Sequence, residues 1–246
     1  LDEIQQFKNH NVYVKVPISE CHQNTGKAPI KVKWIDINKG DEVNKEYRSR
    51  LVAKEIKRDK RDDLFAATPP LEAKKMLFSA AVSAGVGHQA GKKEEGMKID
   101  FIDISRAYFQ AEAIRDVYVQ LPDEDWEEGM CGKLMKSMYG TRDAAQNWGS
   151  TYSEFMKTIG FLQGKSSPCV FWHKEKEIRC VVHGDDFTVL GWSNQLDWFW
   201  SKIKSKFESK HRGRLGPSPS DLKSIRILNR IVEWREEGIV YEADQR

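Results

Sequence analysis

Three aspartates are the residues of this chain whose types and positions could carry chemistry. Asp185 and Asp186 follow Gly184 between two apolar stretches, and Asp103 ends another apolar stretch. Gly and Asp are common turn residues, so the Gly-Asp-Asp motif by itself indicates a plain turn. Carboxylates brought together at one sheet edge repel each other unless divalent cations offset their charge. Asp103 and the Gly-Asp-Asp motif together therefore predict a site for two Mg²⁺ ions, which suits phosphoryl transfer.

The elements that must position these aspartates are short strands. Residues 178–183 and 187–191 flank the acids, and their apolar character predicts a strand, a tight turn and a second strand. Residues 97–103 form a further predicted strand, whose two-residue period puts Phe101 and Asp103 on one face. We therefore expect the acids at the ends of strands.

The rest of the chain alternates between predicted strands and helices. Turn residues separate the extended segments, Pro and Ala mark one helix start, and apolar residues at helical spacing mark the other helices. In chain order we expect a hairpin over 30–53, a helix over 68–84, paired strands at 117–121 and 133–136, helices over 143–159 and 195–209, a break over 213–220, and a hairpin over 223–241.

The composition is that of a folded globular protein. Of the 246 residues, 39% are hydrophobic and 31% are charged, and this length allows one large or two small domains. No stretch approaches the roughly 20 apolar residues of a membrane span, and the chain starts without a signal peptide, so we expect a soluble, intracellular protein. The four cysteines lack metal-ligand spacing and indicate free thiols. Because residue 1 is not Met, we interpret the chain as a segment of a longer polypeptide.

Charge is distributed unevenly along the chain. Residues 1–93 carry 18 Lys and Arg against 12 Asp and Glu (+6), residues 94–193 carry 11 against 17 (−6), and residues 194–246 carry 11 against 8 (+3), which together make the net charge of +3. An acidic middle between basic ends suits a protein that binds cations at its centre and a polyanion outside. The densest basic run, residues 54–61, is either a solvated surface or a phosphate contact.

Beyond these patterns, short motifs occur along almost the whole chain. They are VPI at 16–18, KVKWI at 31–35, YRSRLVAKE at 47–55, FAATPP at 65–70, IDISRAYFQA at 102–111, VYVQLP at 117–122, KLMKSMYGTRDAAQNW at 133–148, VVHGDDF at 181–187 and ILNRI at 227–231. In these motifs, the most distinctive of which lie within 117–187, the sequence resembles the reverse transcriptase domain of copia-type retrotransposon Pol polyproteins.

The resemblance implies an α+β, right-hand polymerase fold with fingers and palm, in which an antiparallel palm sheet is backed by helices. Residues 1–93 would form the fingers-like part and residues 94–193 the palm with the aspartates. Residues 194–246 would form the end of the palm and the start of a truncated thumb.

The implied activity is that of an RNA-directed DNA polymerase. Asp103, Asp185 and Asp186 match the metal-binding aspartates of the family. They would hold two Mg²⁺ ions, with Mn²⁺ as a substitute, while a nucleotide is transferred from a deoxynucleoside triphosphate to a primer 3′-hydroxyl. Asp100 ranks second to Asp103 because no aromatic pair follows it at the same offset.

Other matched positions belong to nucleotide binding. Tyr108 corresponds to the residue under the incoming sugar, where an aromatic ring excludes a 2′-hydroxyl; packing at a strand end is the alternative. Arg48 or Arg50, and Lys54, resemble the basic residues that grip the triphosphate, because guanidinium groups suit phosphate oxygens. For these basic residues and for the matched positions that follow, the alternative to a role in binding is an ordinary position on the surface. The stretch that braces nucleotide and template is matched by Tyr139, Gly140, Arg142 and Gln146.

A last group of matched positions belongs to the primer. His183 and Gly184 would lie beside the primer end, and Leu228 with Asn229 resembles the turn that grips it. Lys210 is a candidate proton donor to pyrophosphate. The departures from the family pattern would alter primer positioning or mark a decaying element copy. They are His183 for Tyr, Gly184 for a larger apolar residue, Ala145 for Pro and Asn229 for Gly.

The implied partners are an RNA or DNA template with its primer and deoxynucleoside triphosphates, without a membrane. Ribonuclease H and integrase regions of the parent polyprotein are expected outside this segment. The expected location is the cytoplasm, including retrotransposon particles, with access to the nucleus. Two other interpretations stay open: a catalytically inactive relic that only binds nucleic acid or protein partners, and an unrelated metal-dependent phosphotransferase.

Overall fold

The computed structural model describes residues 2–38, 40, 44–56, 64–88 and 96–244. The chain divides into two compact units, and each is built from two separate stretches of sequence. The first unit comprises Leu1–Ala66 and Ala107–Thr151, and the second comprises Ala67–Arg106 and Tyr152–Arg246. Both units contain helices and strands, which confirms the predicted α+β class.

The first unit carries two small antiparallel sheets. One has three strands in the order β1-β6-β5, and the other is the hairpin of β2 and β3. Phe7, Leu51 and Phe109 lie in its apolar core. The elements are α1 (Asp2–Asn9), β1 (Tyr13–Pro17), α2 (Ile18–Thr25), β2 (Val32–Asn38), β3 (Tyr47–Ala53), β5 (Tyr118–Val119) and β6 (Met130–Leu134), with short 3-10 turns at Ala107–Gln110 and Asp123–Asp125.

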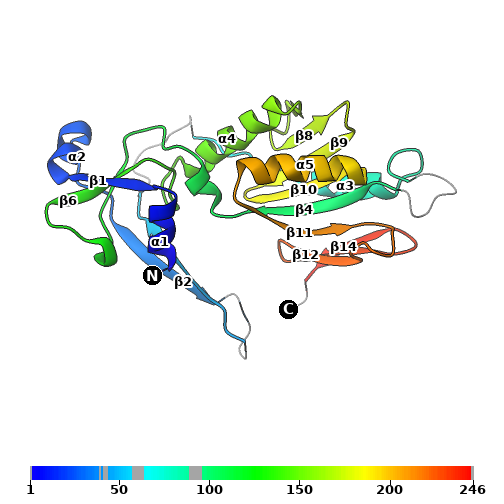
Figure 1. Ribbon diagram of the computed structural model, residues 1–246, viewed down its shortest axis with the longest axis horizontal. Helices are drawn as coiled ribbons and strands as arrows, with labels where there is room; N and C mark the ends of the chain where they lie inside the picture. Colours follow the sequence, from blue (N-terminus) through cyan, green and yellow to red (C-terminus); the bar gives the residue numbers. More distant parts are fainter. Residues whose placement is uncertain (1, 39, 41–43, 57–63, 89–95, 245–246) are drawn as a thin grey trace. The chain divides into compact units, whose positions relative to one another are not determined.

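The second unit is built on a six-stranded antiparallel sheet (Figure 1). Its strand order is β11-β4-β10-β9-β8-β7, and a separate three-stranded sheet follows in the order β12-β13-β14. The strands are β4 (Lys98–Ile104), β7 (Leu162–Gln163), β8 (Val170–His173), β9 (Ile178–His183), β10 (Asp186–Gly191), β11 (Ser209–Leu215), β12 (Ser224–Ile227), β13 (Arg230–Trp234) and β14 (Ile239–Ala243). The helices are α3 (Leu71–Val82), the second half of α4 (Ala144–Thr158), and α5 (Ser193–Lys206).

Different helices cover the two faces of the six-stranded sheet. On one face, here called the α3 face, Phe78 packs in one buried cluster with Phe101 and Leu190. On the other, the α5 face, the ring of Tyr152 from α4 lies 5.8 Å from that of Phe187, and α5 packs against β10 and β11. Because side chains alternate along a strand, the odd-numbered residues of β4 belong to the α3 face and the even-numbered ones to the α5 face.

Most of the predicted elements are confirmed. The hairpin of β2 and β3, the helices α3 and α4, the pairing of β5 with β6 and the strands around Asp185 all form. The segment 223–234, predicted as one arm of a hairpin with 239–241, is instead divided by a turn into β12 and β13, which pair with each other. A second difference has larger consequences. The predicted helix over 195–209 instead ends at Lys206, and the strand β11 occupies residues 209–215. β11 (SKHRGRL) has little apolar alternation, so only its pairing with β4 reveals it as a strand.

The four cysteines are buried free thiols, as predicted. Of the basic run at 54–61, residues 57–61 lie outside the described residues. In the part of the chain that the structure describes, no helix is long and apolar enough to cross a membrane.

Candidate active site

Asp103 and Asp186 lie directly opposite each other on two neighbouring strands. β4 pairs antiparallel with β10, and Asp103 is the partner of Asp186 in that register. Asp185 precedes β10 in the turn, where its carbonyl oxygen accepts a hydrogen bond from the N–H of Ile104 at 2.9 Å. The turn can be tight because Gly184 adopts a φ of 64°, which a residue without Cβ reaches easily. Asp103 thus comes together with the consecutive acids Asp185 and Asp186 at one end of these strands.

The electrostatics of Asp186 reflect this proximity. Its side chain is 18% exposed. Burial, together with the charges of Asp185 and Asp103, raises the pKa of Asp186 to about 6. The positive charges of Lys74 and Arg212 act in the opposite direction on this pKa. Repulsion of this kind between carboxylates is what bound divalent cations would offset.

The donor chemistry of these acids fits Mg²⁺, which prefers carboxylate oxygens. The fit is supported by the negative charges of Asp185 and Asp103, which both raise the pKa of Asp186. Among the described residues, no three His, Cys, Asp or Glu side chains are already gathered as a ligand set. The three carboxylates would therefore have to turn further toward one another to hold ions.

His183 belongs to the same side of the sheet as the acids. It is the last residue of β9 and the direct partner of Asp186, and opposed residues share a face. Burial and the positive charge of Lys74 lower the pKa of His183, which favours a neutral imidazole. At Gly184, apart from its chain neighbours, no atom of the described residues lies within 4 Å of the place of a Cβ, so a Cβ itself would meet no obstacle there, although the positive φ would strain it.

The unpredicted strand β11 brings two cationic residues to the acids. Lys210, the candidate proton donor, is exposed and is the direct partner of Asp103. A register shift interrupts the pairing of β11 with β4 between His211 and Gly213, and bulges of this type redirect side chains. Within the irregular stretch, Nη1 of Arg212 lies 3.8 Å from Oδ1 of Asp186.

Asp100, the second-ranked metal ligand, lies on the α5 face and has a different role. Nε and Nη2 of Arg214 donate to its two carboxylate oxygens at 2.6 and 2.9 Å, and Nε2 of His211 lies 3.0 Å from Oδ2. Burial would raise the pKa of Asp100, but the hydrogen bonds from Arg214 and His211 hold it below its usual range. Asp100 is therefore one partner of a buried ion pair that joins β4 to β11, and its ranking as a metal ligand is not supported.

In the first unit, three predicted nucleotide-binding residues come together. The rings of Tyr108 and Tyr139 have centroids 4.7 Å apart. The guanidinium carbon of Arg50 lies 4.8 Å from the centroid of the Tyr139 ring. Nε of Arg50 is buried without a hydrogen-bond partner among the described residues. Arg50 and Tyr108 thus both contact the ring of Tyr139, which gathers one cation and two rings.

Gly140 allows the segment after Tyr139 to approach β3 closely. It adopts a φ of 86°, and a Cβ there would lie 2.0 Å from the carbonyl oxygen of Ala53. The N–H of Ala53 donates to the carbonyl of Tyr139 at 2.8 Å, so the two segments are hydrogen-bonded as well. Lys54 follows Ala53 and is exposed. Arg48 lies two residues before Arg50 on β3 and so shares its side of the strand.

Leu228 and Asn229 form the turn between β12 and β13. Their φ angles are 46° and 58°, and Ile227 pairs with Arg230 across the turn. Two consecutive positive φ values define a type I′ hairpin turn, in which Asn is one of the favoured residues. Asn229 is therefore compatible with the tight turn where the family usually has Gly.

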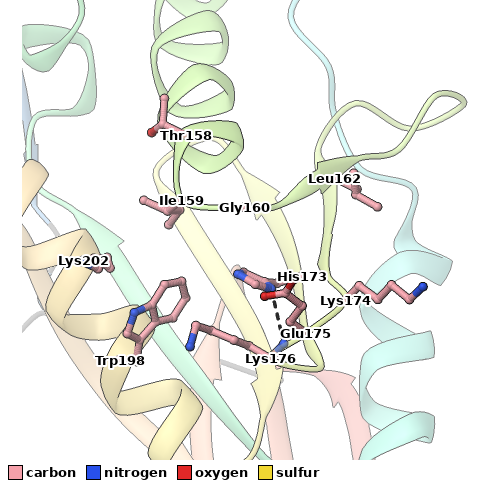
Figure 2. Close-up of a pocket in the computed structure, with 10 residues that line it drawn as sticks. All are labelled: Thr158, Ile159, Gly160, Leu162, His173, Lys174, Glu175, Lys176, Trp198 and Lys202. Atoms are coloured by element: carbon pink, nitrogen blue, oxygen red, sulfur yellow. Dashed lines mark hydrogen bonds between the residues drawn. The ribbon is translucent and has the colours of Figure 1, made fainter.

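A cavity of about 610 Å³ lies elsewhere in the second unit (Figure 2). The cavity lies at the end of β9 where Ile178 pairs with His173, one of its lining residues. The acids follow the opposite end of β9. The side chain of Lys176 lies over the ring of Trp198, with Nζ 4.4 Å from the centroid. The predicted site residues are not among those lining this cavity, which include Lys174, Glu175 and Lys202.

Lys74, like Arg212, is a residue near the acids that the sequence analysis missed. Its side chain is 3% exposed, and its Nζ is buried with no hydrogen-bond partner in the described part of the chain. Lys74, Phe78 and Ala81 have the spacing of one helix face. A lysine inside that apolar stripe was a signal available in the sequence.

Comparison with known proteins agrees with this geometry. A family described as "Reverse transcriptase (RNA-dependent DNA polymerase)" matches residues 19–217. The Pol polyprotein of transposon TNT 1-94 from Nicotiana tabacum is 25% identical over 201 residues, which cover 77% of this chain and 14% of that protein. The Pol polyprotein of transposon RE1 from Arabidopsis thaliana is 25% identical over 167 residues, which cover 65% of this chain and 11% of that protein.

A solved structure supports the fold. Telomerase from Candida albicans, in complex with a fragment of telomeric RNA, superimposes with a TM-score of 0.52 at 10% identity, covering 98% of this chain and 48% of that one. This likeness confirms the predicted polymerase fold.

These findings define a polymerase domain, and the chain belongs to the reverse transcriptase family. Its relatives among retrotransposon Pol polyproteins confirm the resemblance to the copia type. The chain spans 14% and 11% of the lengths of the two polyproteins named above.

Proposed function

We propose that this domain is an active RNA-directed DNA polymerase of a copia-type LTR retrotransposon. A primer 3′-hydroxyl would attack the α-phosphate of a deoxynucleoside triphosphate, and pyrophosphate would leave. The observation that carries the proposal is the register of β4 and β10, which sets Asp103 opposite Asp186 with Asp185 in the adjoining turn. Family membership adds independent support.

In this proposal Asp103 and Asp185 are the principal ligands of two Mg²⁺ ions, and Asp186 adds charge beside them. Such ions would activate the attacking hydroxyl and stabilise the leaving oxygen of an in-line displacement. The raised pKa of Asp186 supports the assignment, because it reports carboxylates close enough to repel each other. Lys210, the partner of Asp103 on β11, would donate a proton to pyrophosphate, and its exposure gives it the reach.

The nucleotide would be bound by residues of the first unit. Tyr108 would lie under the sugar and exclude a 2′-hydroxyl. Arg50, with Arg48 and Lys54 nearby in sequence, would contact the triphosphate, and the unpaired Nε of Arg50 supports this role because it has donor capacity to offer. Tyr139 and Gly140 would hold Tyr108 and Arg50 in position, as their ring contacts and close approach to β3 suggest.

The primer end would lie beside His183 and Gly184 and against the hairpin turn of Leu228 and Asn229. The division into fingers, palm and thumb at 1–93, 94–193 and 194–246 stays a prediction. So do the template and primer partners, the ribonuclease H and integrase regions elsewhere in a parent polyprotein, and a cytoplasmic or particle-associated location with access to the nucleus.

Primer extension on primed RNA and DNA templates tests the proposal. We expect Mg²⁺-dependent extension by the 246-residue chain, with Mn²⁺ as a substitute, and loss of extension in Asp103→Asn and Asp185→Asn. Asp123→Asn, which changes an exposed acid of the first unit, serves as the matched control and should retain activity. Extension falling steeply with salt would agree with phosphate contacts to the template.

Two results would contradict the proposal. No extension by a folded chain that binds primed template would favour the inactive relic. Hydrolysis of free nucleotides without extension would favour an unrelated phosphotransferase. The intact set of Asp103, Asp185 and Asp186 argues against the inactive relic. Membership of the reverse transcriptase family argues against an unrelated phosphotransferase.

A further inference from the structure

The buried ammonium of Lys74 is an unusual feature in the core of the second unit. The side chain is 3% exposed, and Nζ has no hydrogen-bond partner among the described residues. A buried charge is costly unless other charges compensate it. Helix packing alone would be served equally well by an apolar side chain such as Met. Without a negative charge nearby, the buried ammonium of Lys74 would lower the stability of the fold. Acidic groups close to it would offset this effect.

The helix α3 aims Lys74 at the face of the sheet that carries the acids. Phe78 packs with Phe101 of β4, and Lys74 lies one helical turn before Phe78. Asp103 lies two residues beyond Phe101 and therefore on the same face. α3 packs against β4, β9 and β10, the three strands that end or begin at the acids.

The charge of Lys74 acts on the residues at this edge. It opposes the rise in the pKa of Asp186 and contributes to the lowered pKa of His183. Asp186 in turn opposes the fall in the pKa of Lys74 that burial causes. Arg212, whose Nη1 lies 3.8 Å from Asp186, is 40% exposed and so is screened by solvent, whereas Lys74 is not.

We propose that Lys74 is an internal counter-ion of the acidic cluster of Asp103, Asp185 and Asp186, and that it competes with divalent cations for these carboxylates. The inference rests on the proposed function in taking these acids as metal ligands. A fixed positive charge offsets the repulsion of the acids before cations arrive. The same charge repels an arriving cation and so lowers the affinity of the site for metal. Lys74 is a positioning residue, since it acts through Asp186.

Binding of Mn²⁺ to the 246-residue chain, followed by the electron paramagnetic resonance signal of free Mn²⁺, tests this inference without any measure of activity. In Lys74→Met we expect Mn²⁺ to bind about tenfold more tightly, because a like charge has been removed from a poorly screened site. Lys74→Arg keeps the charge and should bind Mn²⁺ as the natural chain does. Lys75→Met, an exposed neighbour on α3, is the matched control and should also leave binding unchanged.

The outcomes separate this inference from the proposed function. Unchanged or weaker Mn²⁺ binding in a folded Lys74→Met variant, where Asp185→Asn still abolishes binding, overturns the counter-ion role alone. Mn²⁺ binding that ignores Asp185→Asn overturns the metal site, and with it both proposals. If Lys74→Met does not fold, Lys74→Gln takes its place, because it also removes the charge and must then show the same tighter binding.

Discussion

Asp100 and Asp103 lie three residues apart on one strand and point to opposite faces of its sheet. Asp103 is paired across the strands with Asp186, whereas both oxygens of Asp100 are bound by Arg214. An odd spacing on a strand always separates two side chains in this way. The first acid is therefore assigned to stability and the second to the proposed chemistry, although their sequence contexts are similar.

Replacement of Asp100 should lower stability. Asp100→Asn leaves the guanidinium of Arg214 and the imidazole of His211 without their carboxylate in a buried setting. Breaking one side of a buried pair in this way costs roughly 3 kcal/mol. Urea unfolding at pH 7 measures the loss, with Asp123→Asn as the exposed control. A free energy of unfolding equal to that of the natural chain would show that the pair contributes nothing.

The contribution of Asp100 should also depend on pH. Its pKa is lower in the folded chain than the ordinary value of 3.8, so the folded state holds the proton less tightly than the unfolded state. The stabilisation is then fully present above the ordinary pKa and is lost as the pH falls through the folded pKa. Unfolding free energies measured from pH 7 downward should show the gap between the natural chain and Asp100→Asn narrowing below about pH 4. A gap that stays constant would contradict the ion pair.

Gly140 should not tolerate a side chain. Gly140→Ala combines a positive φ with a Cβ that would meet the carbonyl oxygen of Ala53, and the two effects together should cost roughly 3 kcal/mol. Gly129→Ala is the matched control, because Gly129 has a φ of 73° with nothing within 4 Å of a Cβ. The difference in unfolding free energy between the two variants isolates the contact with Ala53. Equal losses would mean that the backbone at Ala53 simply moves aside.

Tyr108 should decide between deoxynucleotides and ribonucleotides. Tyr108→Ala removes the ring that would lie against a 2′-hydroxyl, so ribonucleotide incorporation should rise by about tenfold or more relative to deoxynucleotide incorporation. Tyr108→Phe keeps the ring and should keep the discrimination. Steady-state single-nucleotide extension with each substrate gives the ratio. If Tyr108→Ala changes both rates equally, Tyr108 serves only its packing against Tyr139.

Lys210 should matter for the rate of transfer rather than for folding. Lys210→Met removes the candidate proton donor, and the single-turnover rate of extension should fall by about a hundredfold. Lys206→Met, at the end of α5, is an exposed lysine and controls for a general loss of positive charge. A single-turnover rate like that of the natural chain would remove Lys210 from the mechanism.

Much of the local structure could be predicted from the sequence, because it depends on near neighbours. The strands at 98–104, 178–183 and 186–191 have apolar runs, and the turn before Asp185 has a glycine. β11 could not be predicted, because its residues are mostly charged and its strand character depends on hydrogen bonds to β4. Lys210 and Arg212 were therefore without a defined position until the sheet was known.

By itself, the sequence determined the order and type of most elements, the three acids at strand ends and the family to which the chain belongs. The tertiary structure alone decided which of Asp100 and Asp103 meets Asp186, and which lysine is buried beside that acid. The physical reason is that alternation and helical spacing are local properties of the backbone. The register between strands and the face that a helix covers depend on contacts between residues far apart in the chain.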